Sequence, residues 1–278
     1  MSSGSGVGED VPLAVRTQFA HAVVQSLADA AGVDVLHLKG VATDPDLRTR
    51  PAGGIDADVL VRPGQEGVRL DSLWRHGWRR LSSFETGSPF EHAVTAGHPQ
   101  FVHADIHRWF PGMDRSPGTA FEELWAARRI VQIAGVDCSV PSREGQVLIR
   151  VLNTASGDEG PILDLVHRTG AEVAFAAAIG DLERYRGLPE YRLWKVTVQG
   201  GTRTQEWWAR VRARPGVLGK ARLVARAPLV NVDHLRNTWG REPTKKEILR
   251  EFVSRPSRGL RQELRRWALR GRPGRVGR

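Results

Sequence analysis

An apolar run between Gly53 and Val61 carries two aspartates two positions apart, Asp56 and Asp58. Successive side chains of a β-strand point to opposite faces, so both carboxylates would share one face of a strand, with apolar side chains on the other. Neighbouring carboxylates repel each other unless a cation lies between them. A hard divalent cation such as Mg2+ takes oxygen ligands and usually brings phosphates with it. The pair therefore predicts a site for phosphoryl transfer.

An Asp-x-Asp pair is a weak signal by itself. The composition predicts roughly 0.8 such pairs by chance in this chain, the false-positive risk of any short motif. Asp44-Pro45-Asp46 is a second pair of this kind, and its proline favours a turn. An alternative interpretation of Asp56 and Asp58 is that they only cap the end of a strand.

A third aspartate, Asp105, lies in a predicted strand over residues 101–109. Asp105 would share one strand face with His103 and His107. A strand face that is polar at its centre is unusual for a core and indicates a site. The alternative is that Asp105 pairs with Arg108 or His103 and has a structural role.

Lys39 and Gly40 follow a predicted strand over residues 33–38. Glycine allows the backbone to approach a ligand closely, and a turn exposes its amides, so Lys39 and the N–H groups after Gly40 are placed to cradle phosphates. Arg50, in the loop that follows, is a candidate for neutralising phosphate charge. A solvated loop arginine is the alternative interpretation of Arg50.

Histidines provide further candidates around this site. His107 would either orient Asp105 or contact the substrate, and His92 is a candidate for the pocket, as is His103. Asp164 follows in a predicted helix, where we expect a structural pairing with a neighbouring arginine. These residues could support the carboxylates without performing chemistry themselves.

The elements that position these residues follow from hydrophobic periodicity and turn signals. We expect helices over residues 12–31, 65–77 and 121–127, and a helix that starts at Ser142. We expect strands over residues 33–38, 55–61, 78–81, 90–94, 101–109 and 130–134, with a turn over 95–100 and loop or short helix over 41–54. Short helices are expected at 162–167, 171–179 and 182–186, and a capping box at Thr244 and Glu247 opens a helix over 245–253.

Positive charge is concentrated at the end of the chain. Residues 236–278 contain 14 Lys and Arg against 4 Glu, which accounts for the net charge of +10 of the whole chain. A basic helical segment of this kind binds phosphates or an anionic membrane surface, or is a solvated helix face. We expect an α+β protein with a flexible leader (1–11), a catalytic domain with a mixed sheet and flanking helices (12–137), a helical domain (138–235) and a basic helical tail (236–278), whose last residues are disordered.

Several classes of protein do not fit the composition. No apolar run approaches the ~18–20 residues that cross a bilayer, and the N-terminus has no apolar signal region, so we expect a cytoplasmic protein. Cys138 is the single cysteine, which excludes an intrachain disulfide and a thiolate metal cluster. We expect Cys138 to be a small buried hydrophobe.

The order of the motifs resembles the nucleotidyltransferase superfamily related to DNA polymerase β. That pattern is a glycine turn after the first strand, Asp-x-Asp on the next strand and a third Asp on a later one. More narrowly, the chain is similar to a bacterial "uncharacterised nucleotidyltransferase" family with Leu-Lys-Gly, then Arg and Asp-x-Asp-x-Leu-Val, then Asp-Leu-His-Trp. The matching stretches are Leu38-Lys39-Gly40, Arg50, Asp56 to Val61, and Asp105-Ile106-His107-Arg108-Trp109.

The resemblance covers about residues 12–180 and implies an enzyme of the EC 2.7.7 type with a nucleotidyltransferase-type sheet. It implies that Asp56, Asp58 and Asp105 hold two Mg2+ ions and that Lys39, Gly40 and Arg50 bind the NTP. We expect ATP binding, although the sequence does not specify which NTP is used. A nucleoside monophosphate would pass to a hydroxyl of an unidentified acceptor with release of pyrophosphate. The acceptor could be a small molecule, a peptide or protein, or RNA.

A competing hypothesis places the function in the basic tail. The chain would then be a nucleic-acid-binding protein, and its folded part only a platform for residues 236–278. The two hypotheses combine if the acceptor is RNA.

Overall fold

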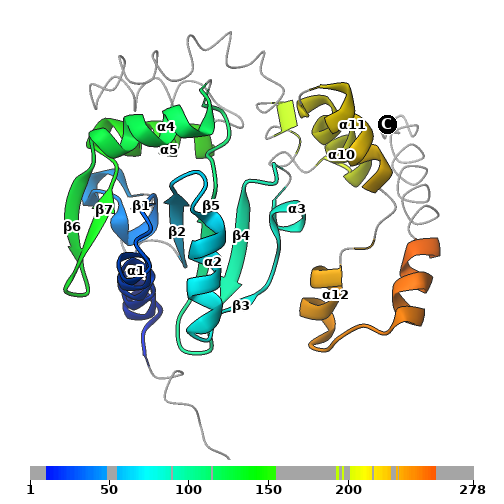
Figure 1. Ribbon diagram of the computed structural model, residues 1–278, viewed down its shortest axis with the longest axis horizontal. Coiled ribbons are helices and arrows are strands. Elements are labelled where there is room, and N and C mark those ends of the chain that lie inside the picture. Colours follow the sequence, from blue (N-terminus) through cyan, green and yellow to red (C-terminus); the bar gives the residue numbers. More distant parts are fainter. Residues whose placement is uncertain are drawn as a thin grey trace, which may run out of the picture. The chain divides into compact units, whose positions relative to one another are not determined.

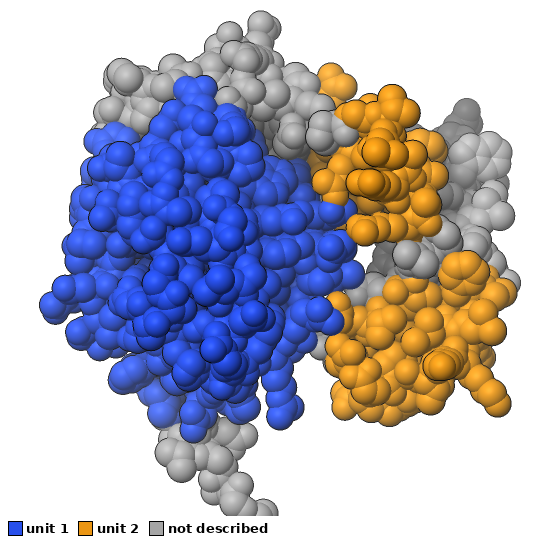
Figure 2. All heavy atoms as spheres, in the orientation of Figure 1, with its two compact units in different colours: residues 1–191 blue, residues 192–278 orange. Residues whose placement is uncertain are grey.

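The computed structural model describes residues 11–48, 55–88, 90–113, 115–154, 192–193, 196, 201–214, 216–226, 230 and 232–254. The chain divides into two compact units, residues 1–191 and 192–278 (Figure 2). The expected domain boundaries after residues 137 and 235 lie inside a strand and a helix, β7 (Val136–Val140) and α12 (Val232–Trp239). The division into a leader, a catalytic domain, a helical domain and a tail stays a prediction.

A five-stranded mixed sheet forms the centre of the first unit (Figure 1). Its spatial order is β1 (Val35–His37), β2 (Asp56–Val61), β5 (His103–His107), β4 (Ala93–Gly97) and β3 (Arg79–Arg80). β2 and β5 are parallel, and the other neighbouring strands are antiparallel. The predicted α+β class with a mixed sheet is therefore confirmed.

Two helices, α1 (Leu13–Ala30) and α2 (Glu66–Arg75), cover one face of this sheet. Ala20 and Val24 of α1 and Leu73 of α2 pack against Ala57 and Val59 of β2. Because side chains alternate along a strand, burial of Ala57 and Val59 under these helices places Asp56 and Asp58 on the opposite face. Packing of Ala57 and Val59 thus determines which way Asp56 and Asp58 point.

A hairpin and two helices follow the sheet in sequence. They are α4 (Pro117–Ala126), β6 (Arg129–Ile133), β7 and α5 (Arg143–Thr154). Ala134 and Gly135 connect β6 to β7 and both have positive φ, as expected for a two-residue hairpin turn of type I′. The sequence analysis predicted the strand β6 but not its partner strand β7.

Cys138 of β7 is fully buried and free, as expected. Burial, together with the charges of Asp29 and Asp137, raises the pKa of its thiol to about 12.

The turn between β4 and β5 differs from the prediction. The hairpin itself is present, but β4 begins at Ala93 and continues to Gly97, through half of the expected turn. Two causes are visible. Glu91 has a φ of 57°, which interrupts an extended strand over residues 90–94. Gly97 is paired with β3 and approaches Leu81 so closely that an added Cβ would lie 2.8 Å from its Cδ1.

The second unit is helical in its described part. Its helices are α10 (Arg203–Ala213), α11 (Val217–Arg226), α12 and a helix over residues 245–254. The predicted capping box is confirmed, because the amide of Thr244 donates to Glu247 Oε2 at 2.8 Å and the amide of Glu247 donates to Thr244 Oγ1 at 3.3 Å.

Short elements complete the described chain: η1 (Gly40–Ala42), η2 (Pro45–Leu47) and α3 (Phe84–Gly87). The loop or short helix expected after Gly40 is confirmed as far as residue 48. The expected helices at 162–167, 171–179 and 182–186, and Asp164 with them, lie outside the described residues, as does the end of the tail from residue 255. Among the described helices, none combines the length and apolar character that a bilayer span needs.

Candidate active site

The Lys39-Gly40 turn brings a lysine side chain back to the sheet. The amide of Leu38 donates to the carbonyl of Asp58 at 3.0 Å, which keeps the chain beside β2 after β1 ends. Lys39 is extended, and Gly40 has a φ of 63°, a conformation that favours glycine. Lys39 Nζ then lies 2.8 Å from Asp58 Oδ1. A glycine at position 40 therefore permits the turn after Lys39.

Parallel pairing of β2 with β5 gathers the carboxylates. In the register of the two strands, Asp58 lies opposite Asp105 and Asp56 lies opposite His103. Residues that are partners in register point to the same face of a sheet, so all three aspartates share the face away from α1 and α2. The structure thus brings together residues 47 positions apart in the sequence.

Asp58 is the most enclosed of the three carboxylates. Its side chain is 6% exposed, and its Oδ1 accepts from Lys39 Nζ at 2.8 Å and His107 Nε2 at 2.9 Å. Burial alone would raise the pKa of Asp58, but the charge of Lys39 and the hydrogen bond and charge of His107 outweigh it and lower that pKa. Asp58 is therefore a carboxylate anion held by two donors.

Asp56 has the opposite electrostatic environment. Burial raises its pKa to about 6, and the negative charges of Asp58 and Asp105 add to this effect, partly offset by Lys39. Neighbouring carboxylates that disfavour each other's ionisation mark an excess of negative charge. A cation at this place would relieve that excess.

Asp105 is oriented by a neighbouring strand. Thr95 of β4 lies opposite Asp105 in register and donates its hydroxyl to Asp105 Oδ1 at 2.7 Å. The alternative partner Arg108 lies instead over the ring of Phe84, 4.5 Å from its centroid. The sequence analysis missed Thr95 because it assigned this residue to a turn; the signal becomes visible only with the register of β4 and β5.

Lys39 carries its charge close to all three carboxylates. Burial would lower the pKa of its ammonium group, but Asp58, through its charge and hydrogen bond, and then Asp56 and Asp105 raise it. The side chain of Lys39 is 29% exposed, in contrast to that of Asp58. One end of this ion pair is thus accessible and the other is buried.

The three histidines have different places. His107 is buried and contacts Asp58. One of the two alternatives from the sequence was that His107 orients Asp105. The His92 ring lies 5.0 Å from that of His107 and its Nδ1 is 2.6 Å from Ser88 Oγ. Burial, with His107 and Lys39, lowers the pKa of His92 to about 2, so this ring is neutral. His103 is exposed beside Asp56.

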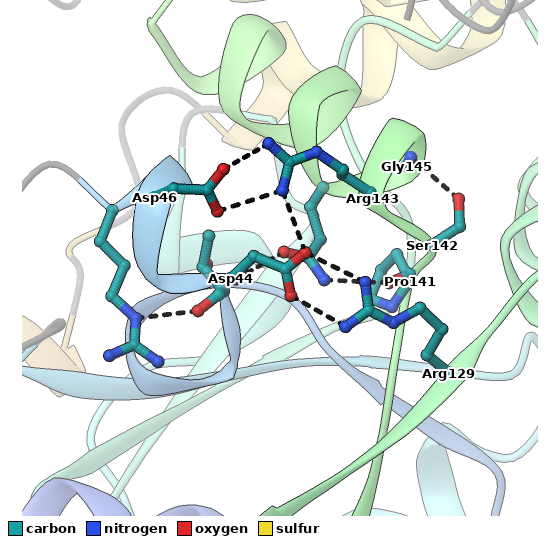
Figure 3. Close-up of polar contacts among 10 residues, drawn as sticks. Asp44, Asp46, Arg129, Pro141, Ser142, Arg143 and Gly145 are labelled. Carbon is teal, nitrogen blue, oxygen red and sulfur yellow. Dashed lines mark hydrogen bonds and ion pairs between the residues drawn. The ribbon is translucent and has the colours of Figure 1, made fainter. Parts of the chain in front are cut away.

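The loop after Gly40 is anchored by charged side chains from later elements (Figure 3). Arg129 of β6 contacts both carboxylate oxygens of Asp44 at 3.0 Å, and Arg143 of α5 binds Asp46 through both of its terminal nitrogens. The amide of Asp44 also donates to Gln146 Oε1 at 2.8 Å. The second Asp-x-Asp pair is therefore a structural clasp, defined by Asp44, Asp46, Arg129 and Arg143.

Arg50 lies outside the described residues, so its predicted contact with phosphate remains a prediction. Arg48, two positions earlier, donates to the carbonyls of Thr43 and Val41 at 2.8 and 2.9 Å. These bonds close the turn between Gly40 and the clasp. Arg48 is thus a residue that shapes the loop from within.

The carboxylates fit a hard divalent cation by their chemistry. They supply oxygen donors, and the raised pKa of Asp56 shows the unneutralised charge that such an ion would meet. The described residues nevertheless contain no set of three His, Cys, Asp or Glu side chains arranged around one point as metal ligands. In the contacts that the structure shows, Asp58 Oδ1 accepts from Lys39 and His107, and Asp105 Oδ1 accepts from Thr95.

Comparisons with known proteins gave only distant matches. No protein-family model and no curated protein matches the chain. Among solved structures, an antigenic nucleotidyltransferase-like protein from Paracoccidioides brasiliensis is similar at 16% identity and a TM-score of 0.37, over 55% of this chain and 75% of that one. The antibiotic-resistance factor ANT(2'')-Ia is similar at 13% identity and a TM-score of 0.35, over 66% of this chain and 91% of that one. At this distance neither match transfers an activity or a residue role.

Proposed function

We propose that this protein is a nucleotidyltransferase that moves a nucleoside monophosphate from an NTP to a hydroxyl group and releases pyrophosphate. One observation carries the proposal: Asp56, Asp58 and Asp105 share one face of two parallel strands, with the ammonium group of Lys39 beside them. Concentrated carboxylates next to an ammonium group are suited to binding a triphosphate together with metal ions. The order of the sequence motifs supports the same reaction.

In this reaction an acceptor oxygen attacks the α-phosphorus of the NTP in line with the leaving group. A new oxygen–phosphorus bond forms, the bond between the α-phosphorus and the bridging oxygen breaks, and pyrophosphate carries away the electron pair. The acceptor hydroxyl must lose its proton. Asp105 is our candidate for helping to remove it, and the hydroxyl of Thr95 holds this carboxylate in place through Oδ1.

Asp56, Asp58 and Asp105 would hold the Mg2+ ions, two in the arrangement that the sequence resemblance implies. When bound, these ions supply positive charge to the triphosphate and lower the pKa of the attacking hydroxyl. The chain's own contribution is positional. His107 orients Asp58 and Thr95 orients Asp105 before any substrate arrives.

The phosphates would meet Lys39 and an amide after Gly40, with Arg50 as a further candidate. In the 3-10 turn Gly40–Ala42, the amides of Ala42 and Thr43 donate to the carbonyls of Lys39 and Gly40 at 3.2 Å, so the amide of Val41 is the candidate donor to a phosphate. The nucleotide base and the acceptor stay open in this proposal. The acceptor is a small molecule, a peptide or protein side chain, or RNA.

The test uses each NTP labelled at the α-phosphate, Mg2+ and a cell lysate that supplies acceptors. We expect one fraction to take up label with release of pyrophosphate, and Asp56→Asn to abolish the transfer. Asp46→Asn is a matched control, because it makes the same change in the other Asp-x-Asp pair. If calorimetry detects no binding of any NTP to the wild-type protein in the presence of Mg2+, the proposal fails.

The basic tail keeps its alternative function as a prediction from the sequence. In the described part of the tail, Arg236 pairs with Asp233 and Glu242, and Arg241 pairs with Glu247. Glu242 and Glu247 are already included in the net charge of residues 236–278, so these pairs do not change it. Truncation after residue 240, which keeps α12 whole, tests the alternative: loss of RNA retention at low salt would support it, and unchanged turnover would make the tail dispensable for the reaction.

A further inference from the structure

A single ion pair joins two residues for which the proposed function needs different partners. Lys39 is the candidate for binding phosphate and Asp58 the candidate for binding metal, yet Lys39 Nζ lies 2.8 Å from Asp58 Oδ1. A carboxylate oxygen that accepts from an ammonium group and from His107 Nε2 at once has little capacity for another cation. In this state the charge of the ammonium group opposes a second cation at Asp58, and Asp58 competes with a phosphate for Lys39.

The two donors to Asp58 differ in their freedom to leave. His107 belongs to β5 and its side chain is 4% exposed. Lys39 lies outside the sheet, at the turn before Gly40; its side chain is 29% exposed and has a flexible four-carbon stem. The ammonium group can therefore leave Asp58 by rotation of its exposed stem, whereas the imidazole is enclosed by the residues around it. This asymmetry points to Lys39 as the moving part.

We propose that Lys39 is a resident cation that occupies Asp58 until an NTP binds, so that nucleotide and divalent cation bind cooperatively. The inference rests on the proposed function and adds an order to it. The triphosphate competes with Asp58 for the ammonium group, and its departure frees Asp58 for the metal. Because coupling between two ligands is reciprocal, the metal must tighten nucleotide binding by the same factor.

The charges around the site agree with this exchange. Lys39 lies near all three carboxylates, so its departure leaves Asp56, Asp58 and Asp105 with their negative charge less compensated. A divalent cation that arrives with the nucleotide replaces one positive charge by two. A metal ion that arrives alone must instead displace or share the site with Lys39, at a cost in affinity.

The experiment measures Mn2+ binding to the full-length protein by electron paramagnetic resonance, first with Mn2+ alone. We compare the wild type with Lys39→Gln, which keeps an N–H donor for Asp58 and removes the charge. We expect Mn2+ alone to bind Lys39→Gln roughly 5–150-fold more tightly than the wild type, the usual span of coupling between two sites. Equal Mn2+ affinity in the two proteins would overturn the inference.

Three further variants secure the interpretation. Lys39→Arg keeps the positive charge, so its Mn2+ affinity should stay close to that of the wild type. The double variant Lys39→Gln with Asp58→Asn should lose the tight Mn2+ binding that Lys39→Gln alone gains. Lys39→Met also removes the charge but has no donor, and it serves as a second variant if thermal unfolding shows that Lys39→Gln folds poorly. We expect the Mn2+ affinity of Lys39→Met to increase as well.

A second series adds α,β-methylene analogues of the four NTPs. We expect one analogue to increase the Mn2+ affinity of the wild type, and to increase that of Lys39→Gln by a smaller factor. An equal increase in both proteins would contradict the role of Lys39, while nucleotidyl transfer would still stand. Failure of all analogues to bind, with or without Mn2+, would instead remove the proposed function itself.

Discussion

The two Asp-x-Asp pairs of this chain have the same spacing and opposite environments. Asp44 and the exposed Asp46 pair with Arg129 and Arg143, and the hydrogen bond and charge of Arg143 lower the pKa of Asp46. Burial and two like charges instead raise the pKa of Asp56 to about 6. The charges of Asp44 and Asp46 are matched by guanidinium groups. Asp56 and Asp58 retain negative charge that only a further cation can balance.

Position in the fold, not spacing, produces this difference. The proline between Asp44 and Asp46 begins η2, so both side chains leave a turn and reach arginines from β6 and α5 (Figure 3). Ala57, between Asp56 and Asp58, is buried under the helices, which turns both carboxylates toward a third one on β5. A pair that neutralises itself locally stabilises structure, and a pair that cannot do so is available for a ligand.

After the loss of transfer expected for Asp56→Asn, the largest effect is expected from Asp58→Asn. This change removes the carboxylate that Lys39 and His107 hold, and we expect turnover of the labelled NTP to fall by roughly 10²–10³-fold, as when one charge-stabilising group is lost from an active site. Asp44→Asn provides the corresponding change in the clasp. Comparable losses of turnover in both variants, with both proteins folded, would erase the distinction between the pairs.

The next prediction concerns pH and Asp56. A carboxyl whose pKa is raised in the folded protein binds its proton more tightly there than in the unfolded chain, so it stabilises the fold at low pH. That contribution is lost as the pH rises from about 4 through about 6. We therefore expect Asp56→Asn to unfold at a higher temperature than the wild type at pH 7 without metal.

This difference between Asp56→Asn and the wild type should narrow as the pH falls toward 4, where Asp56 is protonated in the folded protein and about half protonated in the unfolded chain. Thermal unfolding by circular dichroism at a series of pH values measures it. The sign is the critical result: a variant that is less stable than the wild type at pH 7 would show that Asp56 is not destabilised by its neighbours.

A smaller effect is expected from Arg129→Gln. Asp44 is largely buried and loses a two-pronged partner, so we expect the free energy of unfolding to decrease by about 1 kcal/mol, near the upper end for partly exposed ion pairs. Denaturant unfolding measures this change. Turnover should decrease less than in Asp58→Asn, because the clasp lies in the loop and does not contact the carboxylates of β2.

The smallest effect is expected from Asp46→Asn. Its carboxylate is exposed and its partner Arg143 keeps a second contact with Asp44 at 3.5 Å. Screening by solvent makes such pairs weak, so we expect the unfolding midpoint and the turnover to stay close to those of the wild type. A clear loss of stability that persists at high salt would give the second half of the clasp more weight than its exposure indicates.

Much of the local structure could be predicted from short stretches of sequence. Periodicity located α1, β2 and α2, and Thr244 with Glu247 predicted the start of the helix over residues 245–254. The alternation in β2 also predicted that Asp56 and Asp58 share a face. These features depend on neighbours within a few positions, where propensity and side-chain spacing decide the outcome.

Features that depend on register were not predictable in the same way. The end of β4, the partner strand β7 and the contact of Thr95 with Asp105 follow from pairing between strands. A one-residue change of register moves every side chain to the other face, so composition alone cannot assign such contacts. The chain's own sequence thus determined which residues could form a site and on which strands they lie.

Only the tertiary structure decided which of those residues touch. It paired Lys39 with Asp58, placed His107 on the same oxygen, and gave Asp44 and Asp46 to two arginines far along the chain. The physical reason is that each contact closes a loop of many residues and is determined by how β1, β2, β5, β6 and α5 pack together. Two Asp-x-Asp pairs of the same spacing therefore acquired different chemistry from the elements around them.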